Sequence, residues 1–310
     1  MIASALAVAF LVPAVQAGLC PKWGEPVQTG SLDPALLPEA SGLAVSGKWP
    51  RLYHVNDSGG GPVFYVSDLS GNGLKRVQVE GFLAVDTEDL SLGPCGGKTC
   101  LFIGDTGDNF SHREDVSVAL VVEEKDFGGR VQPLKVLTLR YPDKAHNAEG
   151  LAVHPNGDLF IVTKETAKKK TRPAKLFRLA KDKVMGDEEG TLTLEPWGEV
   201  DVQALNEGTD KWGKTVSSFD IAPDGKRFVL LTYRNALEFS LDLSAGPAPS
   251  RPEEGRDFAR VPLKVLVQQE SVAYLPDGRG LLYDTEFSPG KAEDQAAAEL
   301  IRVPCAEDAF

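Results

Sequence analysis

The sequence predicts an all-β fold, a single β-propeller with five blades. A strand–turn–strand unit recurs five times along the 310 residues. The units begin at Ser41, Glu88, Glu149, Ser218 and Glu270, so successive starts are 47, 61, 69 and 52 residues apart. Repeats of this length with a hairpin in each are typical of propellers, whose four-stranded blades take about 40–50 residues. The last unit lacks one strand, which the N-terminal residues can supply.

The clearest copy of the unit spans residues 147–164. Leu151 and Val153 alternate with smaller residues, and residues 159–162 form a short apolar run that is typical of a buried strand. Between them, residues 155–158 (Pro-Asn-Gly-Asp) have the composition of a tight turn, because Pro presets φ and Gly accepts positive φ. Three other copies share a Pro-x-Gly turn, at Pro94, Pro223 and Pro276, whereas the copy at Ser41 has a different turn.

Each unit leaves room for two further strands. We expect them at 63–66 and 74–79, at 116–122 and 134–140, at 176–179 and 192–200, and at 236–243 and 261–267. Only one strand, residues 299–303, follows the fifth unit, so residues 25–29 are expected to pair with it and close the ring. Closure removes the exposed edge that an open array would carry. A sixth blade is the alternative, if one of the long units contains a degenerate repeat.

Composition and charge indicate a folded protein that does not bind nucleic acid. The chain is 42% hydrophobic, enough for a large core, and its formal net charge is −12, whereas nucleic acid favours a basic face. Residues 1–17 are apolar and end in a small-residue pattern, which predicts a signal peptide before a propeller domain at 18–310. The apolar run is too short for a membrane span. We therefore expect a secreted or periplasmic monomer without a transmembrane segment.

The four cysteines predict two disulfides and raise one alternative. Cys20 would be the lipid-bearing residue of a lipoprotein, but Leu19 stands where bacterial lipoproteins usually have Gly, Ala or Ser, so this alternative is less favoured. Four cysteines in an exported chain allow three pairings. Cys95 and Cys100 flank one hairpin turn, whereas Cys20 precedes the closing strand and Cys305 ends the strand it should pair with. The propeller topology therefore predicts Cys95–Cys100 and Cys20–Cys305.

The same topology brings acidic residues together at one mouth of the central channel. The first strand of each blade lines the channel, and the second strand returns to the end at which the first began. Glu88, Glu149 and Glu270 occupy equivalent repeat positions at the starts of inner strands. Carboxylates that converge in this way raise one another's pKa unless protons or a cation relieve the repulsion. Calcium suits such a site, because it accepts about six to eight oxygen ligands in irregular geometry.

We therefore predict a divalent cation, Ca²⁺, at this mouth. The expected leading ligands are Glu88, Glu149 and Glu270, with Asp57, Asp105 and Asn147 as supplements. The chain has only four histidines, three of them scattered, which disfavours zinc. The alternative is structural: the glutamates accept hydrogen bonds from backbone N–H groups of neighbouring blades and hold the ring together.

Cationic residues near the mouth bear on both charge balance and function. Lys164 and Arg234 end second strands, and they would neutralise the acidic ring without metal if both turned inward. His112 and Arg113 could reach the pocket from the polar loop 107–115. The candidate catalytic residues are Glu88, Glu149, His112, Arg113 and Lys164. A basic run at 168–172 would form a rim that suits a small anionic ester. The sequence contains no Gly-x-Ser-x-Gly motif, so a serine hydrolase is disfavoured.

Several motifs resemble those of the secreted bacterial propellers grouped as esterase-like phytases. They are Ser41-Gly-Leu-Ala-Val, Asn56-Asp57-Ser58-Gly59, Asp86-Thr-Glu88-Asp-Leu, Gly104-Asp-Thr-Gly-Asp-Asn109, Ala148-Glu-Gly-Leu-Ala-Val153 and Glu270-Ser-Val-Ala-Tyr274. More distantly, they look like calcium-bearing propellers with lactonase or arylesterase activity. In the calcium-bearing relatives, acidic residues at the starts of inner strands are metal ligands, which the resemblance assigns here to Glu88, Glu149 and Glu270. Ser41 and Ser218 stand where the other copies have Glu.

Two functions follow from these observations. The first is a phytase-like, cation-dependent esterase or phosphoesterase, in which the metal polarises the substrate oxygen and activates water. The second is a non-catalytic propeller that binds a ligand or a cell-envelope partner across the same face.

Overall fold

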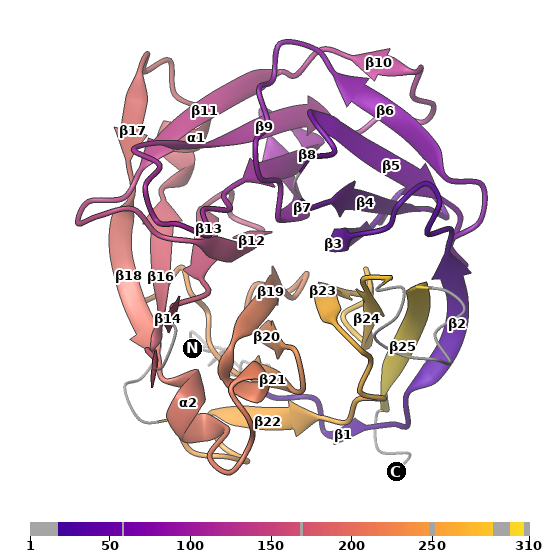
Figure 1. Cartoon of the computed structure of the whole chain (residues 1–310), viewed down its shortest axis with the longest axis vertical. Helices are drawn as coiled ribbons and strands as arrows, with labels where there is room; N and C mark the ends of the chain where they lie inside the picture. The colour runs from indigo at the N-terminus through magenta and orange to yellow at the C-terminus, as the bar shows by residue number, and fades with distance from the viewer. Residues whose placement is uncertain (1–17, 58, 168–169, 248–251, 288–297, 307–310) are drawn as a thin grey trace, which may run out of the picture.

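The computed structural model describes residues 18–57, 59–167, 170–247, 252–287 and 298–306. Five sheets surround a central axis, and each contributes its first strand to the inside of the ring (Figure 1). The prediction of a five-bladed propeller is confirmed. Among the described residues, no helix is long and apolar enough to cross a membrane.

The first two blades each carry a fifth strand on the outside. Blade one contains β3 (Ala40–Val45), β4 (Leu52–Asn56), β5 (Val63–Ser67) and β6 (Lys75–Val79), with β10 (Arg130–Val131) parallel to β6. Blade two contains β7 (Asp89–Cys95), β8 (Lys98–Asp105), β9 (Val116–Val122) and β11 (Lys135–Arg140), with β17 (Thr191–Thr193) parallel to β11. Both added strands come from later in the chain, so each blade is tied to its successor.

The other three blades complete the ring. Blade three contains β12 (Ala148–Val153), β13 (Leu159–Thr163), β16 (Ala174–Leu179) and β18 (Glu195–Val200), and a small hairpin of β14 (Thr166–Ala167) and β15 (Lys170–Thr171). Blade four contains β19 (Val216–Ile221), β20 (Phe228–Thr232), β21 (Ala236–Phe239) and β22 (Phe258–Val261). Blade five contains β23 (Gln269–Tyr274), β24 (Gly280–Thr285) and β25 (Ala298–Ala306), completed by β2 (Val27–Leu32) and β1 (Lys22–Trp23). The short helices are α1 (Lys181–Met185), α2 (Val202–Leu205) and the 3₁₀ turn η1 (Trp212–Lys214).

Two outer strands differ from the sequence prediction. The segment expected as one strand at 192–200 is divided, because β17 pairs with blade two while β18 stays in blade three. In blade four the outer strand is β22 at 258–261 rather than 261–267, and its residues Phe258 and Val261 supply the buried positions. Outer strands are weakly patterned in sequence, because only one of their faces packs against the core.

The hydrophobic core consists of five clusters, one in each interface between adjacent blades. Tyr53 and Leu101 belong to the cluster between blades one and two, and Phe160 and Phe228 to that between blades three and four. The closing interface, between blades five and one, contains Leu37, Leu43, Leu282 and Leu300. Burial of each large apolar side chain contributes about 1.5–3 kcal/mol. Stability is therefore distributed around the ring, and it depends on the ring being closed.

Ring closure by the N-terminal strand and both disulfides are confirmed, although the strand spans 27–32 rather than 25–29. Strand β2 pairs with β25 in antiparallel register from Val27 opposite Arg302 to Leu32 opposite Ala298. Cys95 is bonded to Cys100 across the β7–β8 turn, and Cys20 is bonded to Cys305. Because the sulfur of Cys20 is used in this bond, it is not available to carry a lipid. The predicted signal peptide at 1–17 lies outside the described residues.

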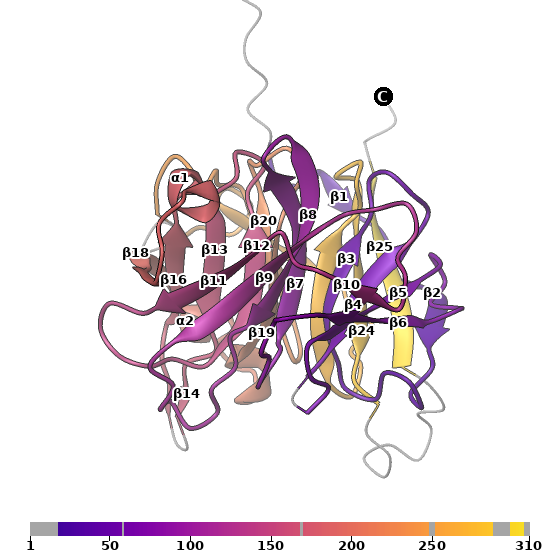
Figure 2. The same cartoon turned by 90° about the horizontal axis from the view of Figure 1, so that it is seen from above.

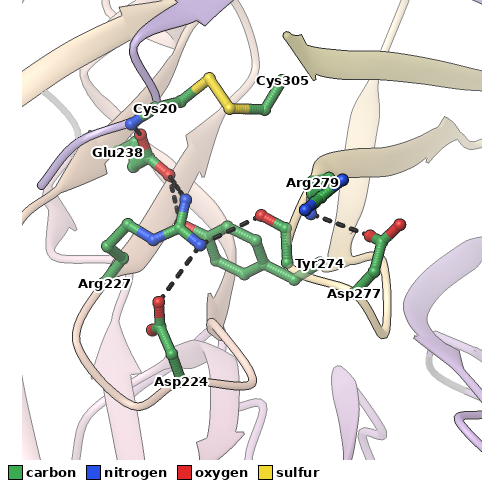
Figure 3. Close-up of a disulfide and its surroundings, with 9 residues drawn as sticks. Cys20, Asp224, Arg227, Glu238, Tyr274, Asp277, Arg279 and Cys305 are labelled. Atoms are coloured by element: carbon green, nitrogen blue, oxygen red, sulfur yellow. Dashed lines mark hydrogen bonds and ion pairs between the residues drawn. A yellow bond between two sulfur atoms is a disulfide. The ribbon is translucent and has the colours of Figure 1, made fainter. Parts of the chain in front are cut away.

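A buried network surrounds the Cys20–Cys305 bond (Figure 3). The Cys20 backbone N–H donates to Glu238 Oε2 at 2.8 Å, and Glu238 Oε1 accepts from Arg227 Nη1 and from the Tyr274 hydroxyl, both at 3.1 Å. Arg227 also donates to the Gly278 carbonyl at 3.0 Å. Glu238 lies in blade four, Tyr274 and Gly278 in blade five, so this network joins the N-terminus to two neighbouring blades.

We expect the two disulfides to contribute unequally to stability. They close loops with sequence separations of 285 and 5 residues. The loop-entropy relation gives about 6 kcal/mol for the long loop and about 2 kcal/mol for the short one. The Cys20→Ser/Cys305→Ser variant should therefore lower the free energy of unfolding in urea by more than Cys95→Ser/Cys100→Ser. Equal losses would show that the long disulfide does not restrain the open chain.

A second buried contact across the closing interface involves His54 of β4 and Asp284 of β24. His54 Nδ1 lies 3.9 Å from Asp284 Oδ2, and both side chains are fully buried. His54 Nε2 lies 2.9 Å from the Ser67 hydroxyl, which donates to the Asp68 carbonyl, so Nε2 carries the imidazole proton. Asp284 also accepts from the Ser271 hydroxyl. Burial lowers the pKa of His54 to about 3, and burial raises the pKa of Asp284 to about 7 against the opposing Ser271 hydrogen bond.

These two pKa shifts have opposite effects on stability. Asp284, with a raised pKa, stabilises the fold fully below about pH 4 and loses that contribution as the pH rises through 7. His54, with a lowered pKa, stabilises the fold above about pH 6.5 and loses that contribution as the pH falls through 3. Between about pH 4 and 6.5 the two effects on the pH dependence of stability cancel. Compared with the unfolded chain, the folded protein binds one proton more on Asp284 and one fewer on His54.

Removal of either partner should reveal how the other one alone makes the free energy of unfolding depend on pH. As the pH rises from about 4 to 6.5, the free energy of unfolding of Asp284→Asn should increase relative to that of the parent. Over the same rise, that of His54→Gln should decrease. Each change should be at most about 1.4 kcal/mol per pH unit. Urea unfolding at several pH values measures both difference profiles. Two flat profiles would contradict the assignment of a neutral imidazole beside a protonated carboxyl group.

Candidate functional site

A β-bulge recurs where the inner strands of four blades begin, and it places one side chain of each of these blades at the channel mouth. The pairing of the first two strands shifts register between Ala40 and Gly42, between Ala148 and Gly150, between Val216 and Ser218, and between Gln269 and Ser271. The residues skipped by the register are Ser41, Glu149, Ser217 and Glu270, and Glu88 immediately precedes the regular pairing of β7. Bulges redirect side chains and are frequent beside active sites.

The bulges correct one position of the predicted repeat. The equivalent residue in blade four is Ser217, not Ser218, because the register skips Ser217. The sequence contained this signal: Ser217 stands six residues before Pro223, as Glu149 stands six before Pro155. The five equivalent positions are therefore Ser41, Glu88, Glu149, Ser217 and Glu270.

Side chains other than these glutamates hold the inner strands together. The Asp89 carboxylate accepts from the Leu151 N–H at 3.1 Å, and Ser91 Oγ accepts from the Val153 N–H at 3.1 Å. In the same way Ser218 Oγ accepts from Val272 and Asp220 Oδ2 from Tyr274, at 3.2 and 2.7 Å. As an alternative, we predicted that the glutamates accept hydrogen bonds from backbone N–H groups of the neighbouring blade. In these two pairs of blades, residues one and three positions after Glu88 and Ser217 accept those hydrogen bonds.

Three carboxylates form a compact acidic cluster at the mouth. Asp57, Asp86 and Glu88 each offer one oxygen atom, and these atoms lie within 4.8 Å of one another. Burial raises the pKa of Asp86, and it raises the pKa of Glu88 well above its ordinary value, with further contributions from the charges of Glu149 and Asp57. Asp86 Oδ1 is buried and has no hydrogen-bond partner among the described residues. The cluster therefore contains acidic oxygen atoms whose charge is poorly compensated.

Gly107 is required beside this cluster. Its backbone N–H donates to the Asp86 carbonyl at 3.0 Å. A Cβ atom at this position would lie 2.4 Å from Glu88 Oε1 and 2.5 Å from Asp86 Oδ2. The loop can approach the two carboxylates only because residue 107 has no side chain.

Lys164 faces the two other glutamates of the ring. Its Nζ lies 2.8 Å from Glu149 Oε1 and 5.3 Å from the centre of the Tyr233 ring. Burial opposes the charged form, but Glu149, Tyr233 and Glu270 together raise the pKa of Lys164 well above its ordinary value. Lys164 therefore remains a cation, with only 17% of its side chain exposed.

Glu270 has only one of its carboxylate oxygen atoms in a hydrogen bond. Oε1 accepts from Gln268 Nε2 at 3.0 Å, whereas Oε2 is buried without a partner among the described residues. Burial, followed by the charge of Glu149, raises the pKa of Glu270 well above its ordinary value. Of the two predicted neutralising cations, Lys164 turns inward, while Arg234 pairs with Asp210 at 3.7 Å at the surface. A single lysine thus faces several carboxylates.

The loop after β8 is built around Asp105 and Arg113. Asp105 Oδ1 accepts from the N–H groups of Val85 and Asp86, at 2.8 and 2.7 Å, and the carboxylate pairs with Arg113. Arg113 also donates to the Gly107 carbonyl at 2.8 Å. Of the predicted site residues, Asp105 and Arg113 therefore position the loop that carries Gly107. Asp105 has no free oxygen for a role as a ligand.

Asn147 and His112 lie on either side of the neighbouring Asp108. Asn147 Oδ1 accepts from the Asp108 N–H at 2.6 Å, and its amide donates to Glu149 Oε1 at 2.9 Å. His112 Nδ1 lies 3.5 Å from Asp108 Oδ1, but 71% of the His112 side chain is exposed. Asn147 thus links the loop to Glu149, whereas His112 is at the solvent edge of the site. In the basic run 168–172, residues 168 and 169 lie outside the described residues.

Comparison with known proteins supports the fold only. No protein-family model matches the chain, and no curated protein matches it in sequence. The soluble aldose sugar dehydrogenase of Escherichia coli is similar in structure, with a TM-score of 0.50 and 14% identity, covering 91% of this chain and 99% of that one. A gluconolactonase of Xanthomonas campestris has a TM-score of 0.46 and 14% identity, covering 87% and 74%. At 14% identity the similarity to the dehydrogenase concerns the fold alone and indicates no particular activity.

Sequence reasoning named Asp86 but did not assign it to the cluster, and it missed the role of Gly107. Asp86 could have been found from its position two residues before Glu88. The role of Gly107 could not, because it depends on how two blades approach each other. The assembled site has hard oxygen donors, partly uncompensated charge and one fixed ammonium group, which together can bind a hard cation and attract an anion.

Loss of Lys164 should destabilise the protein strongly when metal is absent. In Lys164→Met, Glu149 would remain buried beside Glu88 and Glu270 without its partner. Breaking a buried pair from one side costs about 3–5 kcal/mol. We therefore expect a loss of that size in urea unfolding with chelator present.

The matched control is Arg234→Met, which removes an exposed pair. It should change stability by no more than about 1 kcal/mol. Equal effects of the two variants would contradict the assignment of Lys164 as the internal counter-ion of the ring.

Proposed function

We propose that the protein is a hydrolase that uses a divalent cation, Ca²⁺, held by Asp57, Asp86 and Glu88, to cleave an ester or phosphoester. The observation that carries this proposal is the partly buried cluster of three carboxylates in which the buried Asp86 Oδ1 has no partner among the described residues. A buried anionic oxygen without a partner is costly, and a hard cation would satisfy it. Glu149, Glu270 and Asn147 remain supplementary candidates at the same mouth.

The donor set fits the proposed ion. All the available atoms are carboxylate or amide oxygens, and at the equivalent positions blades one and four have the smaller Ser41 and Ser217 in place of glutamate. Ser41 Oγ donates to Glu88 Oε2 at 3.3 Å, which leaves Glu88 Oε1 as the oxygen nearest Gly107. When bound, a divalent cation supplies a Lewis acid for the substrate oxygen and lowers the pKa of a water molecule.

The residues of the chain have separate tasks in this proposal. Asp86 and Glu88 hold the cation, and the Asp105–Arg113 pair fixes the Gly107 loop against them. Glu149, which accepts a hydrogen bond from Asn147, holds the Lys164 ammonium group at the mouth, where it attracts an anionic substrate. His112, at the exposed edge, is placed to meet a substrate rather than the cation.

A non-catalytic binding propeller is the second candidate. The inward position of Lys164 favours it, because this side chain neutralises part of the acidic ring without metal. We also propose export to an oxidising compartment as a monomer, since two disulfides are typical of secreted and periplasmic proteins.

Calcium should stabilise the protein through the acidic cluster. A ligand that binds only the native state stabilises it by about 2.7 kcal/mol at one hundred times its Kd. The melting temperature should therefore rise with Ca²⁺ and fall with chelator. In Asp86→Asn this response should be lost, whereas the exposed Asp187→Asn should keep it. A melting temperature of the metal-free protein that ignores Ca²⁺ would refute the metal site.

Glu149→Gln separates the two candidate functions. If the protein is a cation-dependent hydrolase, this variant should abolish cleavage of chromogenic esters or phosphoesters while circular dichroism shows an intact fold. Calcium binding without any ester hydrolysis in the parent protein would favour the binding propeller.

A further inference from the structure

We propose that a polar pocket beside the acidic mouth, between the loop after β8 and the start of blade three, binds a second anionic group of the substrate. This inference rests on the proposed hydrolase function. The pocket has a volume of about 200 Å³, and Asn109, Ser111, Lys144, Asn147 and Arg172 line its rim. His146 and Glu165 form its base.

Charge balance shows what the pocket can accept. The ring nitrogens of His146 face two carboxylates, Glu165 Oε1 at 2.6 Å and Asp143 Oδ1 at 2.9 Å. Asp143 also pairs with Lys175 at 2.7 Å. The His146 hydrogen bond lowers the pKa of Glu165, against the opposing effect of burial, so this carboxyl group is ionised. Glu165 is therefore held by a hydrogen bond with His146, and Asp143, which does not line the pocket, is paired with Lys175.

The remaining charge on the rim is positive. Among the described residues, no ion pair involves the ammonium group of Lys144 or the guanidinium group of Arg172, although both line the pocket. Two cations and three neutral hydrogen-bonding side chains therefore surround a polar cavity. Phosphate and carboxylate groups match this set, because guanidinium and ammonium groups donate charge-assisted hydrogen bonds to anionic oxygens.

The pocket is joined directly to the candidate catalytic site. Asn147 lines it, and the same amide group donates to Glu149 Oε1 at 2.9 Å and to Asn109 Oδ1 at 3.4 Å. A substrate with one anionic group at the acidic cluster can therefore place a second group between Lys144 and Arg172.

The backbone supports the same location. Ser111 and Glu165 are the only residues other than glycine with positive φ in the described part of the chain, at 50° and 44°. Both line this pocket. Such conformations are costly and cluster at ligand sites, where the surrounding structure holds them in place.

Inorganic phosphate is the first probe, titrated calorimetrically into chelator-treated protein. Lys144→Ala/Arg172→Ala should weaken phosphate binding at least about tenfold, which corresponds to the loss of one charge-assisted interaction. The control Arg130→Ala/Lys226→Ala removes one arginine and one lysine elsewhere on the surface and should leave binding unchanged. Equal phosphate affinity in the parent and the pocket variant would overturn the proposal.

Kinetics with matched esters test the subsite in the Ca²⁺-loaded protein. Phenyl phosphate has one anionic group, whereas 1,4-phenylene bisphosphate and 4-carboxyphenyl phosphate have two. The pocket variant should raise KM about tenfold for the doubly anionic esters, with kcat little changed, and should leave KM for phenyl phosphate unaltered. A rise for the bisphosphate alone identifies the second group as phosphate, and a rise for both identifies any anion of this size. An equal rise for phenyl phosphate would overturn the subsite.

The two levels of the proposal can fail separately. If no ester is cleaved, the hydrolase function fails, and the phosphate titration alone decides the pocket: lost binding in the variant supports it, and unchanged binding refutes it. If the esters are cleaved but the variant behaves like the parent with all three, the hydrolase stands and the pocket is refuted.

Discussion

Closure of the ring is the constraint on which the rest of the structure depends. Each blade buries its apolar side chains against two neighbours, so the five clusters exist only when the last blade meets the first. The N-terminal strand β2 completes the last blade, and the Cys20–Cys305 bond and the Glu238 network fix it there. The His54–Asp284 contact lies at the same closing interface. Covalent, polar and apolar interactions are therefore concentrated where an open propeller would come apart.

Closure also produces two different ends of the channel. At one end lie the Pro-x-Gly turns of four blades, where Pro94, Pro155, Pro223 and Pro276 line a largely apolar pocket of about 380 Å³. At the other end lie the bulges, the acidic cluster and the small hairpin β14–β15. Figure 2 shows this hairpin and α1 at opposite sides of the disc. Because the bulged Glu149 and Glu270 are not needed for the ladder, their side chains can serve a site while Asp89, Ser91, Ser218 and Asp220 hold the strands together. The bulged Ser217 instead donates to the Gln269 carbonyl of blade five at 2.9 Å.

The mouth is organised by an imbalance of charge. Lys164 compensates Glu149, and Arg113 compensates Asp105, but in the cluster of Asp57, Asp86 and Glu88 the buried Asp86 Oδ1 has no hydrogen-bond partner among the described residues. The adjacent pocket has the opposite imbalance, since Lys144 and Arg172 exceed the carboxylates beside them. An acidic cluster that suits a cation therefore lies next to a basic pocket that suits an anion. This pairing favours a metal-assisted reaction on an anionic substrate over a purely structural role for the glutamates.

The sequence by itself determined the propeller, its closing strand and both disulfides, because the recurring hairpin and the missing last strand leave few other ways to bury the apolar faces. It favoured five blades, and the structure decided between five and six. The sequence also placed Glu88, Glu149 and Glu270 at one mouth, since equivalent repeat positions must converge in a closed ring. Only the tertiary structure decided which acids meet: Asp57, Asp86 and Glu88 come from two blades, and their separation depends on the approach of Gly107. Likewise, whether Lys164 or Arg234 turns inward depends on which carboxylate lies within reach, and that is a property of packing between blades rather than of spacing along the chain.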